Sequence, residues 1–370
     1  MSRKNAYAKA GVDYSKIDPF KQTMKSVSRR TLAFPNSRGV YVESNDHGST
    51  FYYAGKSAHR WCQVTEGLGN KNWIAEWMYQ NAGPKTYYRG IGLDTVFMAV
   101  NDLVAQGAMP VVYTDEVAAG DSDWFADEKR ARDLAESFYE ACFATGMALP
   151  AGESPSLRYL VKATPPVKSA PSLSGCATGI ITHGWRPQET RVGDCIIAVA
   201  SSGLHANGVS LVIKEALKLG HKFLTKLPTG RTLGEEALIP TVPYVGLVEA
   251  LLKSGIPVHK FLPGTGGGIS KIAVDKRPFT YQIHDWLDVP PIFRFMHAHC
   301  GVSLQDCLTT FNWGAGYYVF VPKSYVTKTI FAANDAGYVA DFVGRVEEGP
   351  RKVIFQPKGF KRTVLAPPGE

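Results

Sequence analysis

The stretch Gly92–Glu116, GLDTVFMAVNDLVAQGAMPVVYTDE, combines a helical pattern, a break and a short apolar run. Its apolar residues recur at helical spacing, at Val96, Ala99, Val100, Leu103 and Val104. Gly107 and Pro110 end this helix before the run 111–113, which has the character of a strand. The stretch therefore predicts a helix–turn–strand unit.

Three of the polar side chains in this unit are candidate functional residues. Asn101 and Asp102 fall on the helix beside its buried stripe, and Asp115 comes at the end of the predicted strand. Carboxylates are costly to desolvate without a cation or hydrogen-bond donors, so two of them around one such unit indicate a metal or a metal–polyanion complex. The alternative is an exposed helix face and a turn aspartate, and the spacing alone leaves both open.

The chain has 370 residues, of which 45% are hydrophobic and 20% charged, as in ordinary soluble globular proteins. Its length favours two domains. The polar, basic N-terminus has no apolar signal region, and no window approaches the about 18 apolar residues of a membrane span, so we expect a cytoplasmic protein without a membrane partner. The six cysteines are irregularly spaced, without a C-x-x-C pair, and we expect reduced core residues.

The formal net charge of +8 is concentrated near the two ends of the chain. A basic balance fits phosphorylated small ligands or nucleic acid. Zinc-finger spacing, an aromatic RNA-binding motif and a dense arginine run are all absent, so we favour anionic metabolites over nucleic acid. We interpret residues 351–370 as a solvated basic tail.

Two features stand out before the central stretch. In the segment 38–64, GVYVES and STFYYAG flank a turn at 45–48, which predicts a β-hairpin. The following loop TEGLGNKN, residues 65–72, has two glycines and a lysine near a glutamate, so its backbone N–H groups could meet a phosphate. Its spacing does not match the P-loop, which makes this a weak signal.

After the central stretch, the segment 124–144 predicts an amphipathic helix that covers a sheet. Glu153 then falls on a glycine-containing turn, and the proline-rich segment 155–171 is typical of a mobile lid. The run 175–182 predicts a strand that completes the sheet of a first domain, 1–186.

The second domain, 187–350, opens with the strand CIIAVA, which runs into SSGLHANGVS and a helix. This is the geometry in which helix N-terminal amides bind anions, and the crowding of Ser201, Ser202, Gly203, His205 and Asn207 favours a ligand site. The glycine cluster PGTGGGIS, 263–270, opens onto a helical stretch and indicates close backbone approach by a ligand or another loop. TTFNWGAGYYVFV, 309–321, predicts a tight turn before a buried strand.

Five segments, in this order, resemble one family. They are AGVDY (10–14), VNDLVAQGAMP (100–110) with Asp115, SSGLHANGVSLV (201–212), TGGG (265–268) and TFNWGAG (310–316). Together they are similar to aminoimidazole ribonucleotide synthetase, the phosphoribosylformylglycinamidine cyclo-ligase family, over nearly the whole chain.

The resemblance implies a two-domain α+β / α/β fold. An N-terminal ATP-binding and dimerisation domain would contribute strands to a β-barrel across a homodimer, with a C-terminal α/β domain packed against it. It also implies ATP and Mg²⁺ as cofactors and a phosphorylated small-molecule substrate. The implied reaction converts formylglycinamidine ribonucleotide to aminoimidazole ribonucleotide with release of ADP and phosphate.

The resemblance also implies roles for residues in the matching segments. Magnesium would be held by Glu66, Asp102, Asp115 and Glu153. ATP would contact Glu66, Gly67, Gly69, Asn70, Lys71, Asn101, Asp102 and Glu153. The catalytic residues would be Asp115, His205 and Asn207. The substrate would contact Ser201, Ser202, Gly203, Thr265, Gly266, Gly267, Gly268 and Asn312.

The chain departs from the family at several of these segments. The family's TDGVGTK is TEGLGNK at 65–71, and of its GGETAEMPG only Gly152-Glu153 remains. Its glycine-rich substrate loop is replaced by PNSRGVYVESNDHGSTFYY at 35–53, and Asp121 stands where a lysine is expected. Two alternatives therefore stay open: a sister ATP-dependent enzyme resembling thiamine-monophosphate kinase or selenophosphate synthetase, and a non-catalytic nucleotide-binding paralogue.

Overall fold

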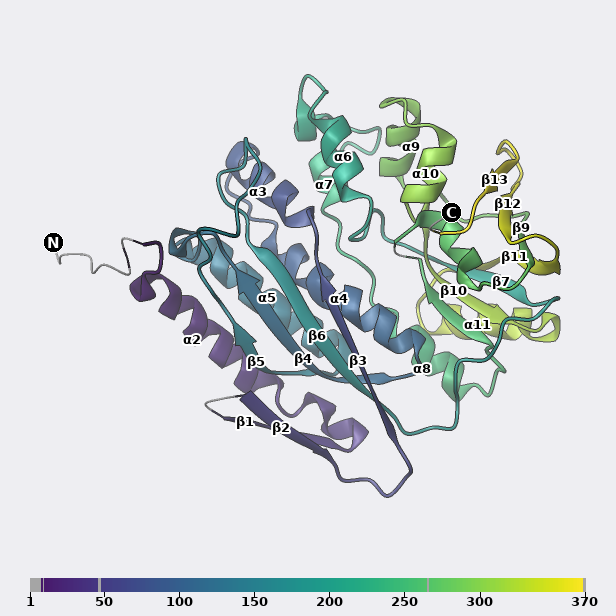
Figure 1. Cartoon of the computed structure of the whole chain (residues 1–370), viewed down its shortest axis with the longest axis horizontal. Helices are drawn as coiled ribbons and strands as arrows, with labels where there is room; N and C mark the ends of the chain where they lie inside the picture. Colours follow the sequence, from purple (N-terminus) through teal and green to yellow (C-terminus); the bar gives the residue numbers. More distant parts are fainter. Residues whose placement is uncertain (1–7, 9, 46–47, 265, 369–370) are drawn as a thin grey trace. The chain divides into compact units, whose positions relative to one another are not determined.

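The computed structural model describes residues 8, 10–45, 48–264 and 266–368. Internal contacts divide the chain into two units, coloured from purple to teal and from teal to yellow along the sequence in Figure 1. Unit 1 comprises the residues up to 103 together with 108–182, and unit 2 comprises 104–107 and the residues from 183. None of the described helices has both the length and the apolar character that a membrane span requires.

The sheet of unit 1 has four strands in the order β3-β6-β4-β5. Their bounds are β3 Arg60–Gly67, β4 Met109–Ala118, β5 Ala148–Glu153 and β6 Ser172–Ile181. Strand β6 pairs antiparallel with β3 and β4, whereas β4 and β5 run parallel. The sheet is open, so the described chain contains no closed barrel.

The central stretch folds as the predicted helix–turn–strand unit, made of helix α4 (Tyr88–Ala105), a turn and strand β4. Gly107 has φ +76° in the turn, a conformation that glycine adopts without strain. Strand β4 is longer than predicted because it pairs with β5 on one side and β6 on the other. Asp115 therefore lies within the strand, and Glu153 is the last residue of β5 instead of a turn residue.

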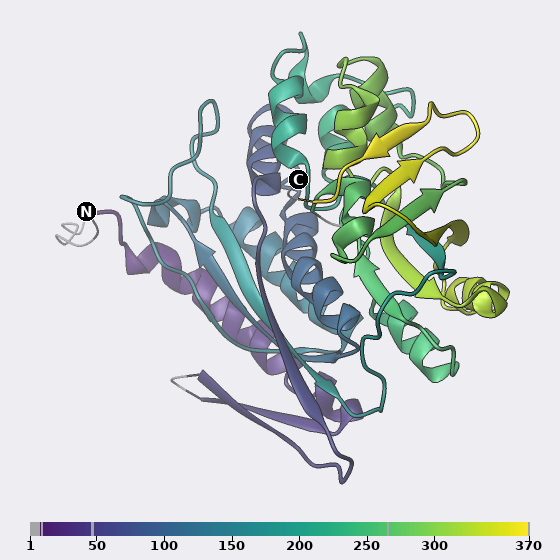
Figure 2. The ribbon, with the colours of Figure 1, turned by 45° about the vertical axis from the view of Figure 1, so that its right-hand side comes forward.

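Helices α4 and α5 cover one face of this sheet (Figures 1 and 2). Helix α5 (Glu128–Thr145) begins where the Asp127 side chain accepts a hydrogen bond from the Arg130 backbone N–H. The Tyr113 hydroxyl on β4 donates to the Thr95 carbonyl on α4, and its ring packs against Phe138 of α5. The remaining helices of unit 1 are α2 (Tyr14–Thr31), α3 (Lys71–Asn81) and the 3-10 helices η1 (Phe34–Arg38) and η2 (Ser122–Trp124).

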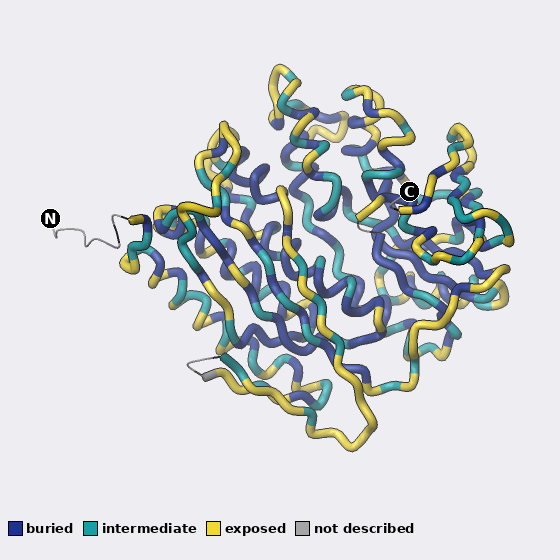
Figure 3. The backbone as a smooth tube through the Cα atoms, viewed as in Figure 1, coloured by how far each residue is buried: buried dark blue, intermediate teal, exposed yellow. Residues whose placement is uncertain are grey.

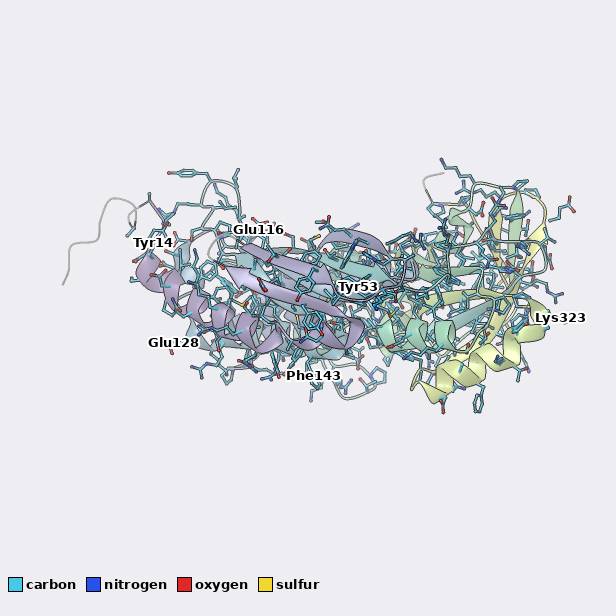
Figure 4. All side chains as sticks on the ribbon, turned by 90° about the horizontal axis from the view of Figure 1, so that it is seen from below. Tyr14, Tyr53, Glu116, Glu128, Phe143 and Lys323 are labelled. Atoms are coloured by element: carbon cyan, nitrogen blue, oxygen red, sulfur yellow. The ribbon has the colours of Figure 1, made fainter. Side chains whose placement is uncertain are left out.

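The predicted hairpin is confirmed by strands β1 (Val40–Asn45) and β2 (Gly48–Tyr53), which pair antiparallel as a separate two-stranded sheet. Strands β2 and β3 consist of exposed and half-buried residues, and Figure 3 shows the exposed ones in yellow. Figure 4 shows Glu116 of β4 and Phe143 of α5 on opposite sides of unit 1. The face of the sheet opposite the helices is therefore the more accessible one.

Unit 2 contains a seven-stranded sheet in the order β13-β12-β9-β11-β7-β10-β8, antiparallel except for the parallel pair β12 and β9. Its strands are β7 Cys195–Ala200, β8 Lys260–Pro263, β9 Phe279–Ile283, β10 Ala315–Val321, β11 Ala340–Glu348, β12 Lys352–Phe355 and β13 Thr363–Leu365. The last two strands correct our interpretation of 351–370 as a tail. Val353, Phe355 and Leu365 are buried, and their burial explains why the segment joins the sheet.

The helices of unit 2 are α6 Val209–Ala216, α7 Leu233–Ala237, α8 Val245–Lys253, α9 Pro291–Ala298, α10 Leu304–Thr310 and α11 Val326–Asp335. Three short 3-10 helices accompany them, η3 Lys222–Leu224, η4 Gly268–Val274 and η5 Lys323–Tyr325. The helical stretch expected after the TGGG cluster is thus the 3-10 helix η4, which has a kink at Ala273.

Candidate active site

One row of residues crosses the sheet of unit 1 near the end of β4. Asp115 pairs with Gly152 on β5 and with Gly175 on β6, and Gly175 in turn pairs with Glu66 on β3. Cross-strand partners point to the same face of a sheet, so Glu66 and Asp115 share a face. Two strand spacings separate them, which is about 10 Å. The intervening position is Gly175, and the Tyr113 phenol occupies the space that a Cβ there would need.

Asp115 is held in an environment that disfavours its charge. It is only 7% exposed, and its Oδ1 has no hydrogen-bond partner among the described residues. The pKa of this carboxyl is raised to about 7, mainly by burial. A backbone hydrogen bond lowers the pKa, and the nearby Glu153 and Glu116 carboxylates raise it. A Cβ at Gly152 would overlap Oδ1, so glycine at that position makes room for the carboxylate.

Asp115 lines a cavity of about 990 Å³ in unit 1. Glu153, an exposed residue, lines the same cavity. Hairpin residues Ser44 and Gly48 contribute to its wall, and the Ser44 hydroxyl donates to the Pro150 carbonyl at 2.8 Å. The cavity therefore brings together two of the four acids that we expected to bind magnesium.

The same cavity also has a basic lining. Lys21, Lys25 and Arg29 of helix α2 line it, together with Ser28. These cations are spaced by four residues and so lie along one face of the helix. The cavity thus presents carboxylates from the sheet and cations from α2.

The other predicted nucleotide contacts lie elsewhere in unit 1. Lys71 forms an ion pair of 2.8 Å with Asp94 of α4, and both side chains are fully buried. Burial lowers the pKa of the Lys71 ammonium, whereas Asp94 raises it. In this structure the Lys71 ammonium faces Asp94 and is not exposed to a ligand.

Asn101 is buried and Asp102 half-buried on helix α4, and neither lines the cavity that contains Asp115. Asn70 immediately precedes helix α3, and Gly69 before it has φ +72°. Within the described residues, no three His, Cys, Asp or Glu side chains form a group that could hold a metal. The four predicted magnesium ligands are therefore not assembled into one cluster.

Three glycine-rich motifs meet at one edge of the sheet in unit 2. Strands β7 and β8 both pair antiparallel with β10, so the loops after β7 and β8 lie beside the loop that precedes β10. Two backbone hydrogen bonds join these loops. The Ser201 N–H donates to the Gly314 carbonyl at 2.8 Å, and the Gly264 N–H donates to the Gly316 carbonyl at 2.9 Å. The sheet topology thus gathers three motifs of which the first and the last, at Ser201 and Gly314, are more than a hundred residues apart.

Asn312 is the hydrogen-bonding centre of these loops. Its amide donates to the Gly203 carbonyl at 2.8 Å and accepts from the Ser201 hydroxyl and the Gly314 N–H, both at 2.9 Å. The residue is 5% exposed. Its polar groups are therefore used to hold the loops together, although we expected it to contact a substrate.

His205 has a similar internal role in this structure. It is fully buried with φ +56°, and its Nε2 accepts a hydrogen bond from the Ser202 N–H at 3.3 Å. The Ser202 hydroxyl donates to the Pro240 carbonyl at 2.5 Å. Of the residues predicted in this loop, Asn207 is half-buried and lies near Gly266.

The TGGG cluster is described in part. Thr265 lies outside the described residues, and Gly266, Gly267 and Gly268 all have positive φ. A Cβ at Gly268 would overlap the Leu308 carbonyl, whereas one at Gly267 would meet no atom within 4 Å. Close backbone packing therefore explains one of these glycines, and an open surface adjoins another.

Two features of unit 1 were missed in the sequence. Asp94 lies inside the opening stretch, but its partner Lys71 is too distant in sequence for spacing to reveal the pair. The four-residue spacing of Lys21, Lys25 and Arg29 could have identified a basic helix face, but we treated these residues only as terminal charge.

Comparison with known proteins identifies the family. Residues 57–181 match the model for the N-terminal domain of AIR synthase related proteins, and residues 191–356 match the model for the C-terminal domain. A phosphoribosylformylglycinamidine cyclo-ligase from Alkaliphilus oremlandii is 32% identical over 361 residues, covering 95% of this chain and 99% of that protein. The chain belongs to the AIR synthase family. A relative of the same name from Synechocystis is 32% identical over 293 residues, covering 77% of this chain and 81% of that protein.

Solved structures of more distant proteins share the fold of this AIR synthase family member. The hydrogenase maturation protein HypE of E. coli has a TM-score of 0.61 at 14% identity, covering 95% of this chain and 98% of that one. A thiamine-monophosphate kinase from Stenotrophomonas maltophilia has a TM-score of 0.56 at 17% identity, covering 94% and 97%. Both support a mixed α/β fold in two parts.

Proposed function

We propose that the protein is an ATP-dependent cyclo-ligase of purine biosynthesis that acts in the cytoplasm. It would convert formylglycinamidine ribonucleotide to aminoimidazole ribonucleotide with release of ADP and phosphate. The observation that carries the proposal is the end-to-end similarity to a relative of that name, which spans 95% of this chain and 99% of the relative.

The reaction has a simple chemical requirement. An amide oxygen is a poor leaving group, so ATP first phosphorylates the formyl oxygen of the substrate. A nitrogen of the substrate then attacks the formyl carbon, the new C–N bond closes the imidazole ring, and phosphate leaves with that oxygen. The protein must therefore hold two phosphorylated compounds and offset the charge that develops during phosphoryl transfer.

The cavity of unit 1 fits a magnesium–nucleotide complex. Magnesium in such enzymes is usually held by one or two carboxylates together with phosphate oxygens and water, so a cluster of three protein ligands is not required. Asp115, whose Oδ1 has no hydrogen-bond partner in the described part of the chain, and Glu153 would hold the ion. A bound magnesium ion would neutralise phosphate charge during the transfer.

We propose a narrower role for the loops of unit 2. Because Asn312 and His205 are buried and hydrogen-bonded, they would keep the three glycine-rich motifs in place. The backbone around Gly266 and Gly267, together with Asn207, would contact the phosphorylated substrate. Glycines with positive φ at an open surface leave space for such close approach.

We further propose a homodimer in which unit 1 pairs through the open side of its sheet. Tyr41, Phe51, Tyr52 and Trp61 are between 37% and 57% exposed on β1, β2 and β3, an aromatic surface typical of an interface. Two open sheets that meet in this way could form the family's barrel. Sedimentation at micromolar concentration should give a dimer, and a monomer alone would contradict this part of the proposal.

The function is tested by ADP release. We expect ADP to form from ATP and formylglycinamidine ribonucleotide, but not from ATP alone or from ATP with thiamine monophosphate. ADP release with thiamine monophosphate would instead support a sister kinase. Absence of release with every substrate, despite nucleotide binding, would support a non-catalytic paralogue.

A further inference from the structure

Helix α2 carries two kinds of cation. Lys16 pairs with Asp123, and Arg30 pairs with Glu136 at 2.9 Å, so both are neutralised at the surface. Lys21, Lys25 and Arg29 form no ion pair with any carboxylate of the described residues. Their charge therefore lacks an internal partner.

These three cations share one wall of the cavity that contains Asp115. Their contacts with other groups of the described chain are weak. The Lys21 ammonium lies 5.9 Å from the centroid of the Tyr14 ring, and the Arg29 Nε donates to the Lys25 carbonyl at 3.3 Å. Cations that line a hollow raise the local concentration of anions there, because the low-dielectric wall focuses their field.

The spacing of the cations indicates the shape of the anion. Lys21 and Arg29 are eight residues apart on one helix, which corresponds to about 12 Å along its axis. This span is longer than a single phosphate group and is comparable with a chain of several phosphates. The acids Asp115 and Glu153 line the same cavity, so an anion that arrives with a divalent cation would satisfy both walls.

We infer that Lys21, Lys25 and Arg29 form a polyphosphate-binding wall, which holds the phosphate chain of the nucleotide against the carboxylates of the sheet. This inference rests on the proposed function for the identity of the nucleotide, but the binding of a polyphosphate does not depend on it. The wall is a determinant of nucleotide affinity and contributes no reacting group.

The test compares charge-neutral variants on the two faces of α2. The triple variant Lys21→Gln, Lys25→Gln, Arg29→Gln removes the wall, and the double variant Lys16→Gln, Arg30→Gln removes paired cations that do not line the cavity. Binding of tripolyphosphate, of ATP and of ribose 5-phosphate, each with Mg²⁺, is measured by calorimetry. The melting temperature without ligand is recorded for every variant.

Each of the three cations, of which Lys25 and Arg29 are exposed and Lys21 is half-buried, is expected to contribute about fivefold to affinity, so the triple variant should bind tripolyphosphate and ATP about a hundredfold more weakly. The double variant should bind both within about twofold of the wild type. The effect should shrink at high salt, which screens exposed charges. The triple variant should melt within a few degrees of the wild type, because the three side chains form no ion pair within the described residues. The variant Lys21→Arg, Lys25→Arg, which keeps the positive charges, should retain most of the wild-type affinity.

Unchanged binding of tripolyphosphate and ATP by a folded triple variant would overturn the inference. So would a loss confined to ribose 5-phosphate, or an equal loss in the double variant. These binding outcomes differ from a failure of the proposed function. If the protein binds tripolyphosphate through the wall but releases no ADP, the inference about the wall stands and the proposed cyclo-ligase function fails. If the protein is an active cyclo-ligase and the triple variant has an unchanged KM for ATP, the proposed function stands and the inference about the wall fails.

Discussion

Asp115 in unit 1 and Asn312 in unit 2 are both buried polar residues that sequence motifs mark as functional, but their surroundings differ. The Asn312 amide takes part in hydrogen bonds with Ser201, Gly203 and Gly314. Asp115 has one oxygen without any hydrogen-bond partner in the described chain, and its pKa is raised to about 7. Asn312 therefore stabilises the fold, whereas burial of the Asp115 carboxylate lowers the free energy of unfolding.

This difference shows how a crowded polar motif is to be interpreted. A buried polar group that is fully hydrogen-bonded is explained by structure alone, whereas one left without a partner requires another explanation, such as a ligand. By this criterion the strongest site candidate is the cavity of unit 1, although the loops of unit 2 have more motif residues. Substitutions at the two positions should therefore have opposite effects on activity and stability.

The largest effect is expected for Asp115→Asn, which keeps the size of the side chain and removes its charge. Turnover should fall by at least about a hundredfold, because charge stabilisation through a bound metal is worth several kcal/mol. Folding without ligand should survive, since the neutral amide avoids the desolvation that burdens the carboxylate. The rate of ADP formation and the melting temperature without ligand are measured together. A variant that melts lower yet turns over at the wild-type rate would contradict a role at the site.

Asn312→Ala should have the converse effect. It removes the acceptor of the Gly314 N–H and one hydrogen bond each from the Gly203 carbonyl and the Ser201 hydroxyl, which should cost about 3 kcal/mol of stability and lower the melting temperature. Asn207→Ala, in the half-buried part of the same loop, is a matched control and should change stability by less than about 0.5 kcal/mol. An Asn312→Ala protein of normal melting temperature that has lost turnover would instead make Asn312 a substrate contact.

The smallest of these effects concerns pH. Because the pKa of Asp115 is raised from 3.8 to about 7 in the folded protein, the native state holds a proton that the unfolded chain releases at lower pH. The stability from this proton is complete below about pH 4 and is lost as the pH rises through about 7. Relative to Asp115→Asn, the wild-type protein without ligand should lose about 2.5 kcal/mol between pH 5 and pH 8. Parallel melting curves for the two proteins across that range would show that Asp115 is ionised throughout.

The sequence predicted helices and strands correctly where a single short segment contains the residue pattern that specifies them. The helical spacing before Gly107 gave α4 and β4, and the turn between two aromatic runs gave the hairpin of β1 and β2. Pairing over long distances was not visible. Strand β12 joins the sheet by pairing with β9, about seventy residues earlier, so the basic residues near it concealed a strand.

The same limit applied to the candidate site. The sequence identified Asp115 and Glu153, and the structure places both at one cavity. It could not show that Lys71 is buried against Asp94, because that depends on how α3 packs beside α4. The spacing of Lys21, Lys25 and Arg29 indicates a helix face, but the sequence could not show that this face lines a cavity. What a helix face packs against is a property of the folded chain.

The most direct test of the account follows the formyl oxygen of the substrate. Formylglycinamidine ribonucleotide labelled with ¹⁸O at the formyl group is incubated with ATP, Mg²⁺ and the protein, and the released inorganic phosphate is analysed by mass spectrometry. If ATP phosphorylates that oxygen before the ring closes, the label should appear in the phosphate in proportion to the aminoimidazole ribonucleotide formed. Unlabelled phosphate accompanying ring closure would contradict the proposed cyclo-ligase mechanism.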